Sequence, residues 1–382
     1  MFVVTAGAAH AGGRPSAPPG FFGVATPHVA NASYNNRVRT FAALRNSGIE
    51  TVSYVFDWAG IEPSHREFNF VYADHAVRSA ASNGLSISAT IFNAPDWALP
   101  PRRSRPGYYP PNSNAQFADF ARHLARRYGP SGAFWTENPG VAKIPVRLWR
   151  IWNEPNLRNY WASGPNPKRY VRLLRAARNS IKAVDRSAIV TTGGIPNSRL
   201  GIPMDTFIKR IYKAGGRSAL DGIALNPYAT NHRGVIAAIR RTRATMSRYR
   251  HRSARIWITE FGWSDAGPPS PFFAGRSGQA RQIGRTVDAV LKARAKFKVG
   301  GLIYFALRDQ VVSEDDDWWG VHTGLFNVSG GAKPAWKALY TRARATRRVR
   351  GPSPDSVLTA IPGDNDYSPS DFTAATSSGD DR

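Results

Sequence analysis

The sequence predicts an α/β chain folded as one closed (β/α)8 TIM barrel, a single domain with flexible termini. Three observations lead to this prediction. Between residues 21 and 347, strand-like apolar runs alternate with helical patterns. The runs number eight, and each is followed by a loop and then a helical pattern. No Gly-rich phosphate-binding fingerprint follows a strand, which weighs against the doubly wound open sheet that shows the same alternation.

The strands are predicted from short runs rich in aliphatic and aromatic residues. In chain order they are 21–26, 51–56, 85–92, 146–152, 188–194, 221–226, 254–259 and 301–307.

The helices are predicted from apolar periodicity and from end signals. One amphipathic helix facing a sheet is indicated by apolar residues that recur at steps of four and three, namely Tyr170, Leu174, Ala177, Ile181 and Val184. The pattern "NSNAQFADFARHLARRYG" begins at an Asn cap and ends at Gly129, and "YADHAVRSAASNG" ends at Gly84.

The composition bounds the function. With 382 residues, 42% of them apolar and 12% aromatic, the chain has enough material for a sizeable core, which excludes global disorder. The absence of cysteine excludes disulfides, thiolate zinc sites and cysteine nucleophiles. No uninterrupted apolar run reaches about 18 residues, so no membrane-spanning helix is expected.

The two termini differ in composition from the body. The stretch "MFVVTAGAAHAGG" resembles a signal peptide without its basic start, so we expect 1–20 to be a flexible or remnant signal segment. We accordingly expect a secreted or cell-envelope-associated protein. Residues 348–382 are expected to form a disordered acidic tail, since the part from Gly351 carries six Asp and one Arg.

The net charge of +26 is carried mostly by arginine along the predicted helices. This balance suggests a nucleic-acid hypothesis, but a solvated Arg-rich surface is the preferred explanation. Attraction to an anionic polysaccharide or to the cell envelope is the third interpretation.

Two carboxylates directly follow hydrophobic strands, Glu154 in "WNEPN" and Glu260 in "WITEFGW". The reactive face of a (β/α)8 barrel lies at the carboxyl ends of its strands. The fourth and seventh strands are three apart in the ring, so both side chains can point into one cleft. Two facing carboxylates are the minimal equipment for cleaving a glycosidic bond, and the retaining arrangement sets them about 5–5.5 Å apart. We predict both as catalytic residues.

Neighbouring residues fit the same chemistry. Tyr228 is placed to give Glu260 a hydrogen bond, and such bonds hold down the pKa of a carboxylate, whereas apolar walls and a second carboxylate raise the pKa of the acid. Asn153 is predicted to hold the 2-hydroxyl of the sugar.

Further sugar contacts are predicted at the strand ends. They are His28, Trp58, Asn93, Trp97, Asn226, Trp263, Trp318 and Trp319. For each Trp a place in the core is the plain alternative, and for His28 a packed imidazole. Along the fourth strand, alternation puts Trp152 on the side of Glu154 and Trp149 against the helices. The run "SEDDDWW" lacks the Gly and distal Glu of a calcium loop, so no metal site is predicted.

Taken together, "WNEPN", "WITEFGW", the intervening Asn-Pro-Tyr and "FDWAGIEP" resemble the retaining clan A glycoside hydrolases, cellulase-like and family 39-like members above all. The resemblance covers roughly residues 21–345. It implies Glu154 as acid/base and Glu260 as nucleophile with Tyr228 beside it. Cellulase-like members carry an arginine on the second strand where this chain has Ser53, and many relatives place a Trp at the position of Phe305.

The first functional hypothesis is therefore a retaining β-glycoside hydrolase acting by double displacement. Its predicted partner is an oligo- or polysaccharide substrate, an anionic one included, bound by a monomer with no nucleic acid, no membrane span and no cofactor. The alternative is a non-catalytic glycan-binding protein on the same barrel, which Ser53 favours. The sequence leaves open the sugar, the linkage and endo or exo action.

Overall fold

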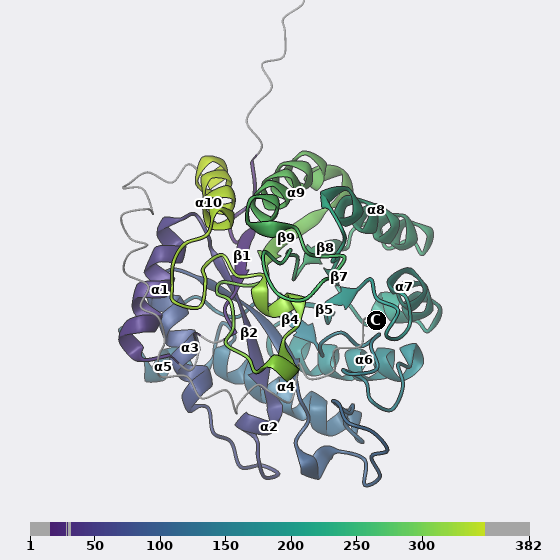
Figure 1. Ribbon diagram of the computed structural model, residues 1–382. Coiled ribbons are helices and arrows are strands. Elements are labelled where there is room, and N and C mark those ends of the chain that lie inside the picture. Colours follow the sequence, from purple (N-terminus) through teal and green to yellow (C-terminus); the bar gives the residue numbers. More distant parts are fainter. Residues whose placement is uncertain (1–15, 28, 30–31, 348–382) are drawn as a thin grey trace, which may run out of the picture.

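The structure is a computed structural model that describes residues 16–27, 29 and 32–347 (Figure 1). The first 15 residues, His28 and the predicted acidic tail from 348 lie outside the described residues.

Within the described residues, nine parallel strands build one closed barrel. They are β1 (Phe22–Ala25), β2 (Thr51–Asp57), β3 (Ser86–Phe92), β4 (Leu148–Ile151), β5 (Ile189–Thr192), β6 (Ile195–Pro196), β7 (Gly222–Asn226), β8 (Arg255–Ile258) and β9 (Val299–Tyr304). The order around the sheet is β5-β4-β3-β2-β1-β9-β8-β7-β6, and a pairing of Thr191 in β5 with Gly222 in β7 closes the ring. The two-residue β6 continues the course of β5, so the ring has eight positions. All eight predicted strands are confirmed.

Helices surround the barrel on the outside (Figure 1). They are α1 (Tyr34–Asn46), α2 (Trp58–Ile61), α3 (Val71–Ser82), α4 (Asn114–Tyr128), α5 (Ala133–Glu137), α6 (Pro167–Val184), α7 (Met204–Lys213), α8 (His232–Arg248), α9 (Gly275–Phe297) and α10 (Pro334–Arg347). Each barrel position is followed by at least one of them, which is the predicted (β/α)8 connectivity.

The helix starts follow from their capping residues. The side chain of Asn166 accepts a hydrogen bond from the backbone N–H of Arg169, and Pro167 occupies the first turn of α6, where its missing N–H costs nothing. Helix α4 begins at Ser113, whose hydroxyl accepts from the N–H of Gln116, so the predicted Asn cap is wrong by one residue. It ends at Gly129, as predicted.

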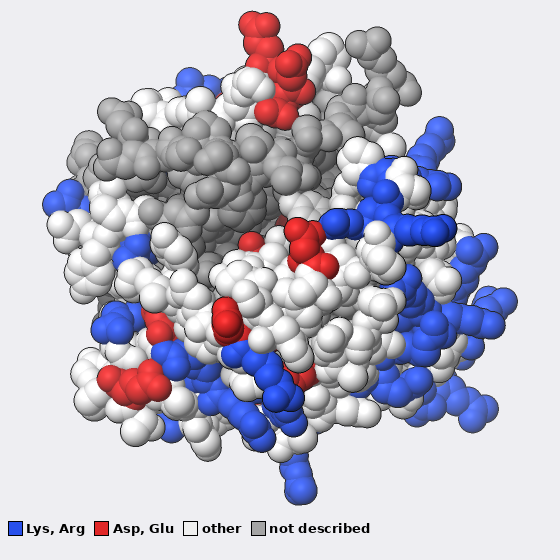
Figure 2. Space-filling view, turned by 90° about the horizontal axis from the view of Figure 1, so that it is seen from below, with Lys and Arg blue, Asp and Glu red and all other residues white. Residues whose placement is uncertain are grey.

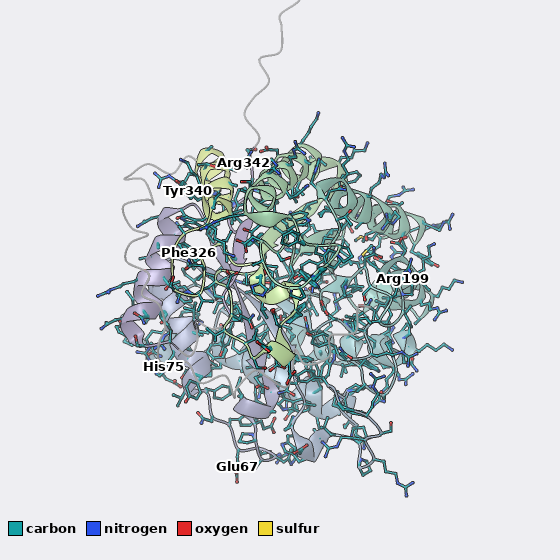
Figure 3. The ribbon with its side chains drawn as sticks, viewed as in Figure 1. Glu67, His75, Arg199, Phe326, Tyr340 and Arg342 are labelled. Atoms are coloured by element: carbon teal, nitrogen blue, oxygen red, sulfur yellow. The ribbon has the colours of Figure 1, made fainter. Side chains whose placement is uncertain are left out.

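Aromatic side chains fill the layer between barrel and helices. Trp149 is fully buried and its ring lies 5.9 Å from that of Phe56, which in turn lies 5.2 Å from Tyr128 of α4. The predicted outward direction of Trp149 is confirmed. Phe326 and Tyr340, both labelled in Figure 3, flank the buried Trp336 of α10 at 5.2 and 5.4 Å. Each such side chain contributes about 1.5–3 kcal/mol through burial.

The described residues before β1 are held against the last helix. Gly20 donates its N–H to Glu50 (2.9 Å), and Arg347 at the end of α10 donates to the other oxygen of that carboxylate (2.8 Å). Arg347 also donates to the carbonyl of Ala17 (2.9 Å). Both ends of the barrel domain are therefore fastened at one carboxylate.

Positive charge gathers on one side of the molecule, over α6, α7 and α8 (Figure 2). The span 167–255 carries 20 Lys and Arg against three Asp, so ion pairs leave most of these cations uncompensated. Arg199, labelled in Figure 3, lies on the same side. Within the described part of the chain, no helix has the length and apolarity needed to cross a bilayer.

Candidate active site

Glu154 reaches the barrel mouth through an irregular turn after β4. Trp152 and Glu154 both have left-handed backbone conformations, with φ of 69° and 39°. This interrupts the strand alternation. Trp152 consequently packs outward, its ring 6.0 Å from Phe117 of α4 and 6.0 Å from Trp161. The prediction that Trp152 faces the same side as Glu154 is wrong, because alternation applies only while the backbone stays extended.

The buried carboxylate of Glu154 is held by an amide from β7. Asn226 donates through Nδ2 to Oε1 of Glu154 over 2.8 Å, and its Oδ1 accepts from the hydroxyl of Thr259 over 2.8 Å. A Cβ at Gly194 would lie 2.1 Å from the Asn226 amide, so only glycine leaves room for it there. Asn226 is fully buried. The structure therefore corrects the predicted sugar contact to a positioning residue for Glu154.

Glu260 follows β8 and faces the same mouth. The hydroxyl of Tyr228 donates to Oε2 of Glu260 over 2.9 Å, which confirms the predicted hydrogen bond. The partly exposed ring of Trp319 lies 4.9 Å from Tyr228 and 4.5 Å from Phe272. The loop after β9 thus brings an aromatic wall to the side of Glu260.

A buried cation completes the site from inside the barrel. Arg150 of β4 is 1% exposed, and its Nη2 donates to the hydroxyl of Ser53 and to the carbonyl of Ser88 (3.2 Å). Burial raises the pKa of Glu260, and the positive charge of Arg150 opposes that rise. Burial lowers the pKa of Arg150 to about 10, so the guanidinium stays charged at neutral pH. The second strand has Ser53 where the resemblance implied an arginine, and the cation that acts on Glu260 comes from the fourth strand.

The surroundings give the two carboxyl groups different pKa values. Burial, and next the charge of Glu260, raise the pKa of Glu154 to about 8. The hydrogen bond from the Asn226 amide opposes this rise. Burial also raises the pKa of Glu260, but Arg150, Tyr228 and Asn226 oppose that rise. Because the cation and the hydroxyl donor stand at Glu260, this group ionises first and Glu154 keeps its proton at neutral pH.

The remaining predicted sugar contacts fall into three groups. Trp58 and Trp263 are fully buried, with indole N–H groups bonded to Glu62 (2.7 Å) and to the carbonyl of Ala229 (2.8 Å). They are core residues, and the prediction that they stack on sugar is wrong because neither ring has a free face.

Trp97 and Trp318 are partly exposed in the loops after β3 and β9. The indole of Trp97 donates to the carbonyl of Glu62 over 3.0 Å, and Trp318 lies 5.1 Å from Trp319. Their roles toward sugar stay predictions.

Asn153 is partly exposed beside Glu154, and Asn93 donates to Asp57 at the ends of β3 and β2. His28 lies outside the described residues. Within those residues, no group of three or more His, Asp or Glu side chains is arranged to hold a metal ion.

Two residues of the site were missed at the level of sequence. Arg150 carried a signal, a charge inside an apolar strand, on the face opposite to Trp149. Tyr160 carried none, because it lies in the loop after β4. Burial raises its pKa, and the charges of Glu154 and Glu260 raise it further.

The structure thus joins a closed eight-position parallel barrel to one carboxylate after the fourth and one after the seventh barrel strand, and it shares this barrel fold with solved structures of glycosidases. Among solved structures, a family 39 glycoside hydrolase from Bacteroides cellulosilyticus WH2 superposes with a TM-score of 0.65 at 19% identity, covering 85% of this chain and 63% of its own. A monomeric β-xylosidase from Caulobacter crescentus CB15 gives 0.60 at 16% identity, covering 84% and 67%.

Xylanase 10B from Thermotoga maritima gives a TM-score of 0.57 at 16% identity, covering 86% of this chain and 96% of the xylanase. The chain therefore spans less than two thirds of the family 39 enzyme and nearly all of the xylanase. No protein-family model and no curated protein sequence matches the chain. At these identities the likeness establishes the barrel fold.

Proposed function

We propose that this protein is a retaining β-glycoside hydrolase that cleaves O-glycosidic bonds in an oligo- or polysaccharide. The observation that carries the proposal is the pair of electrostatically coupled carboxyl groups: the pKa of Glu154 is raised to about 8, whereas Arg150 and Tyr228 stabilise the charged form of Glu260. Glycoside hydrolysis needs one carboxyl protonated and the other ionised.

In the first step, a carboxylate oxygen of Glu260 attacks the anomeric carbon. The bond from that carbon to the leaving oxygen breaks, and the proton of Glu154 passes to the departing oxygen. In the second step Glu154 takes a proton from water, whose oxygen displaces Glu260 from the sugar. Tyr228 and Arg150 hold Glu260 in its ionised form before the attack.

The test is turnover of a panel of p-nitrophenyl β-glucoside, β-xyloside, β-mannoside and β-galactoside. Glu154→Gln is expected to lower turnover about 10²–10⁴-fold, and Glu260→Ala at least as much, since it prevents the covalent intermediate. Glu137→Gln, an exposed change on α5, serves as matched control and keeps full activity. A variant of Glu154 or Glu260 with near-normal turnover on the best substrate contradicts the proposal.

Labelling separates an enzyme from a glycan-binding protein. A 2-deoxy-2-fluoro glycoside with a dinitrophenyl leaving group is expected to label Glu260, detected by peptide mass spectrometry. Binding of sugars with neither labelling nor turnover supports the non-catalytic alternative. The feature that favoured that alternative, Ser53, is accounted for by Arg150, which contacts Ser53 directly.

A further inference from the structure

The ends of β2 and β3 place a third carboxylate at the barrel mouth. Asp57, the last residue of β2, pairs in register with Phe92 of β3. Asn93 follows with a left-handed φ of 62°, and its Nδ2 donates to Oδ1 of Asp57 over 2.9 Å. The Asp57 side chain is exposed, yet desolvation raises its pKa. Asp57 is therefore open to solvent at the barrel mouth while protein atoms pack closely around it.

Two tyrosines connect this carboxylate with the predicted catalytic pair. The rings of Tyr108 and Tyr160 stack with planes 4° apart and centroids 5.8 Å apart. Both pack on Phe92, at 4.5 and 5.8 Å. After burial, the charge of Asp57 is the next cause that raises the pKa of Tyr108, and the catalytic pair acts likewise on Tyr160. Asp57, the stacked tyrosines and the catalytic pair thus follow one another along the mouth.

The donors around Asp57 are neutral. Its Oδ1 accepts from the Asn93 amide and from the backbone N–H of Ala59 (3.1 Å). No ion pair among the described residues involves Asp57. Because a carboxylate offers about four acceptor positions, capacity remains for hydroxyl groups of a ligand. A charge left without a cation favours hydroxyl donors and repels anions.

The mouth and the outer surface have opposite character. The span 167–255 is strongly basic, whereas Asp57, Glu154 and Glu260 stand at strand ends of the mouth, and the buried Arg150 acts on Glu260 alone among them. A sugar carboxylate attracted to the outer surface would meet repulsion at the mouth.

We propose that Asp57 and Asn93, beside Tyr108 and Tyr160, form a subsite that binds a neutral sugar unit through its hydroxyl groups and rejects a unit carrying a carboxylate. This inference rests on the proposed function, whose substrate class it narrows to glycans that are neutral next to the point of cleavage. Asp57 is the specificity-determining residue and takes no part in bond breaking.

A purely structural role for Asp57 is the competing explanation, since its side chain caps the four-residue α2. Asp57→Asn separates the two roles, because asparagine caps a helix about as well as aspartate. The substitution removes the charge and half of the acceptor capacity while it keeps the cap. Asp288→Asn is the matched control: this exposed carboxylate of α9 pairs with Arg342 on the helix layer.

The experiment measures binding by calorimetry in the inactive Glu260→Gln protein. The probes are xylohexaose, cellohexaose, mannohexaose and, as anion, hexagalacturonate. At least one neutral probe is expected to bind, with affinity lowered about tenfold or more by Asp57→Asn and unchanged by Asp288→Asn. Hexagalacturonate is expected not to displace the bound neutral probe. Anion binding to the basic surface is recognised by steep salt dependence and indifference to Asp57→Asn.

Three results overturn the inference: an unchanged affinity of Asp57→Asn for every neutral probe, displacement of a neutral probe by hexagalacturonate, or binding of no neutral probe. Hydrolysis by the unmodified chain is measured separately. Absence of hydrolysis with binding that depends on Asp57 overturns the proposed function and supports the subsite. Hydrolysis by the unmodified chain, together with sugar binding that Asp57→Asn does not change, supports the proposed function and overturns the subsite.

Discussion

The guanidinium of Arg150 on β4 donates a hydrogen bond to the hydroxyl of Ser53 on β2, across the intervening strand β3. The small side chain at 53 leaves the barrel interior to the arginine at 150, whose charge acts on Glu260. The cation that acts on the predicted nucleophile therefore stands on β4, two strands from the position of Ser53 on β2.

Removing this cation is expected to disturb the ionisation of Glu260. In Arg150→Ser the pKa of Glu260 is expected to rise further, because the cation that opposes the effect of burial on this pKa is lost. We expect kcat/KM to fall about 10²–10³-fold and the acid limb of its pH profile to move to higher pH. Steady-state kinetics on the best aryl glycoside, with circular dichroism as a check on folding, measures both.

The exchange Ser53→Arg with Arg150→Ser returns the cation from the opposite side of β3. We expect the double variant to recover at least tenfold in kcat/KM over Arg150→Ser and to restore the acid limb. An acid limb that stays in place in Arg150→Ser contradicts the role given to this residue.

The pH profile of kcat/KM reports the two carboxyls of the free enzyme. Glu154 works as an acid only while protonated, so activity falls as pH rises through its pKa of about 8. Glu260 works only when ionised, and its raised pKa places the acid limb above the ordinary 4.5. Activity that persists unchanged to pH 10 contradicts the assignment of Glu154.

Tyr228→Phe removes the hydroxyl that donates to Oε2 of Glu260 and keeps the ring that packs on Trp319. Loss of a hydrogen bond to a charged group costs about 1.5–3 kcal/mol, so kcat is expected to fall about 10–100-fold with an upward shift of the acid limb. Tyr249→Phe, on the outer surface after α8, is the control. Equal loss of activity in both variants would argue for a general effect on folding.

Glu154 also links stability to pH. Its pKa is raised from 4.5 to about 8 in the folded chain, so the native state holds a proton that the unfolded state has lost in this window. The stabilisation is complete below pH 4.5 and is lost as pH rises through about 8. Glu154→Gln removes this dependence and is expected to raise the free energy of unfolding at pH 9 by a few kcal/mol relative to the unmodified chain. Urea unfolding at pH 5 and pH 9 measures the free energy of unfolding of both proteins. A difference between Glu154→Gln and the unmodified chain that is the same at both pH values contradicts the prediction.

A buried ion cluster fastens the two loops beside Glu260. Lys333 is 3% exposed and pairs with Asp265 (2.6 Å) after β8 and with Asp309 (2.5 Å) after β9. Lys333→Met leaves two buried carboxylates without their cation, which costs about 3–5 kcal/mol. The midpoint of urea unfolding measures this cost, and Lys337→Met on the exposed face of α10 is the control. A shift no larger than that of the control contradicts a stabilising role for the cluster.

The sequence by itself determined the eight barrel strands and the positions of Glu154, Glu260 and Tyr228. These follow from local pattern: an apolar run sets a strand, and the residue after the run stands at the carboxyl end, where a parallel barrel has its open face. The number of runs then fixed which strands could share one cleft.

Only the tertiary structure decided which side chains near those ends reach the mouth. From the sequence, Trp58 and Trp263 were predicted to stack on sugar. In the structure both are buried, and their indole N–H groups donate to Glu62 and to the carbonyl of Ala229. Asn226 turns to Glu154 because Gly194 leaves it room. Arg150 meets Ser53 across β3, where Ser88 pairs both with Ser53 and with Leu148, two residues before the arginine. Such contacts depend on how the barrel strands and their loops pack in space. No period or spacing along the chain encodes the distance between side chains that are far apart in the sequence.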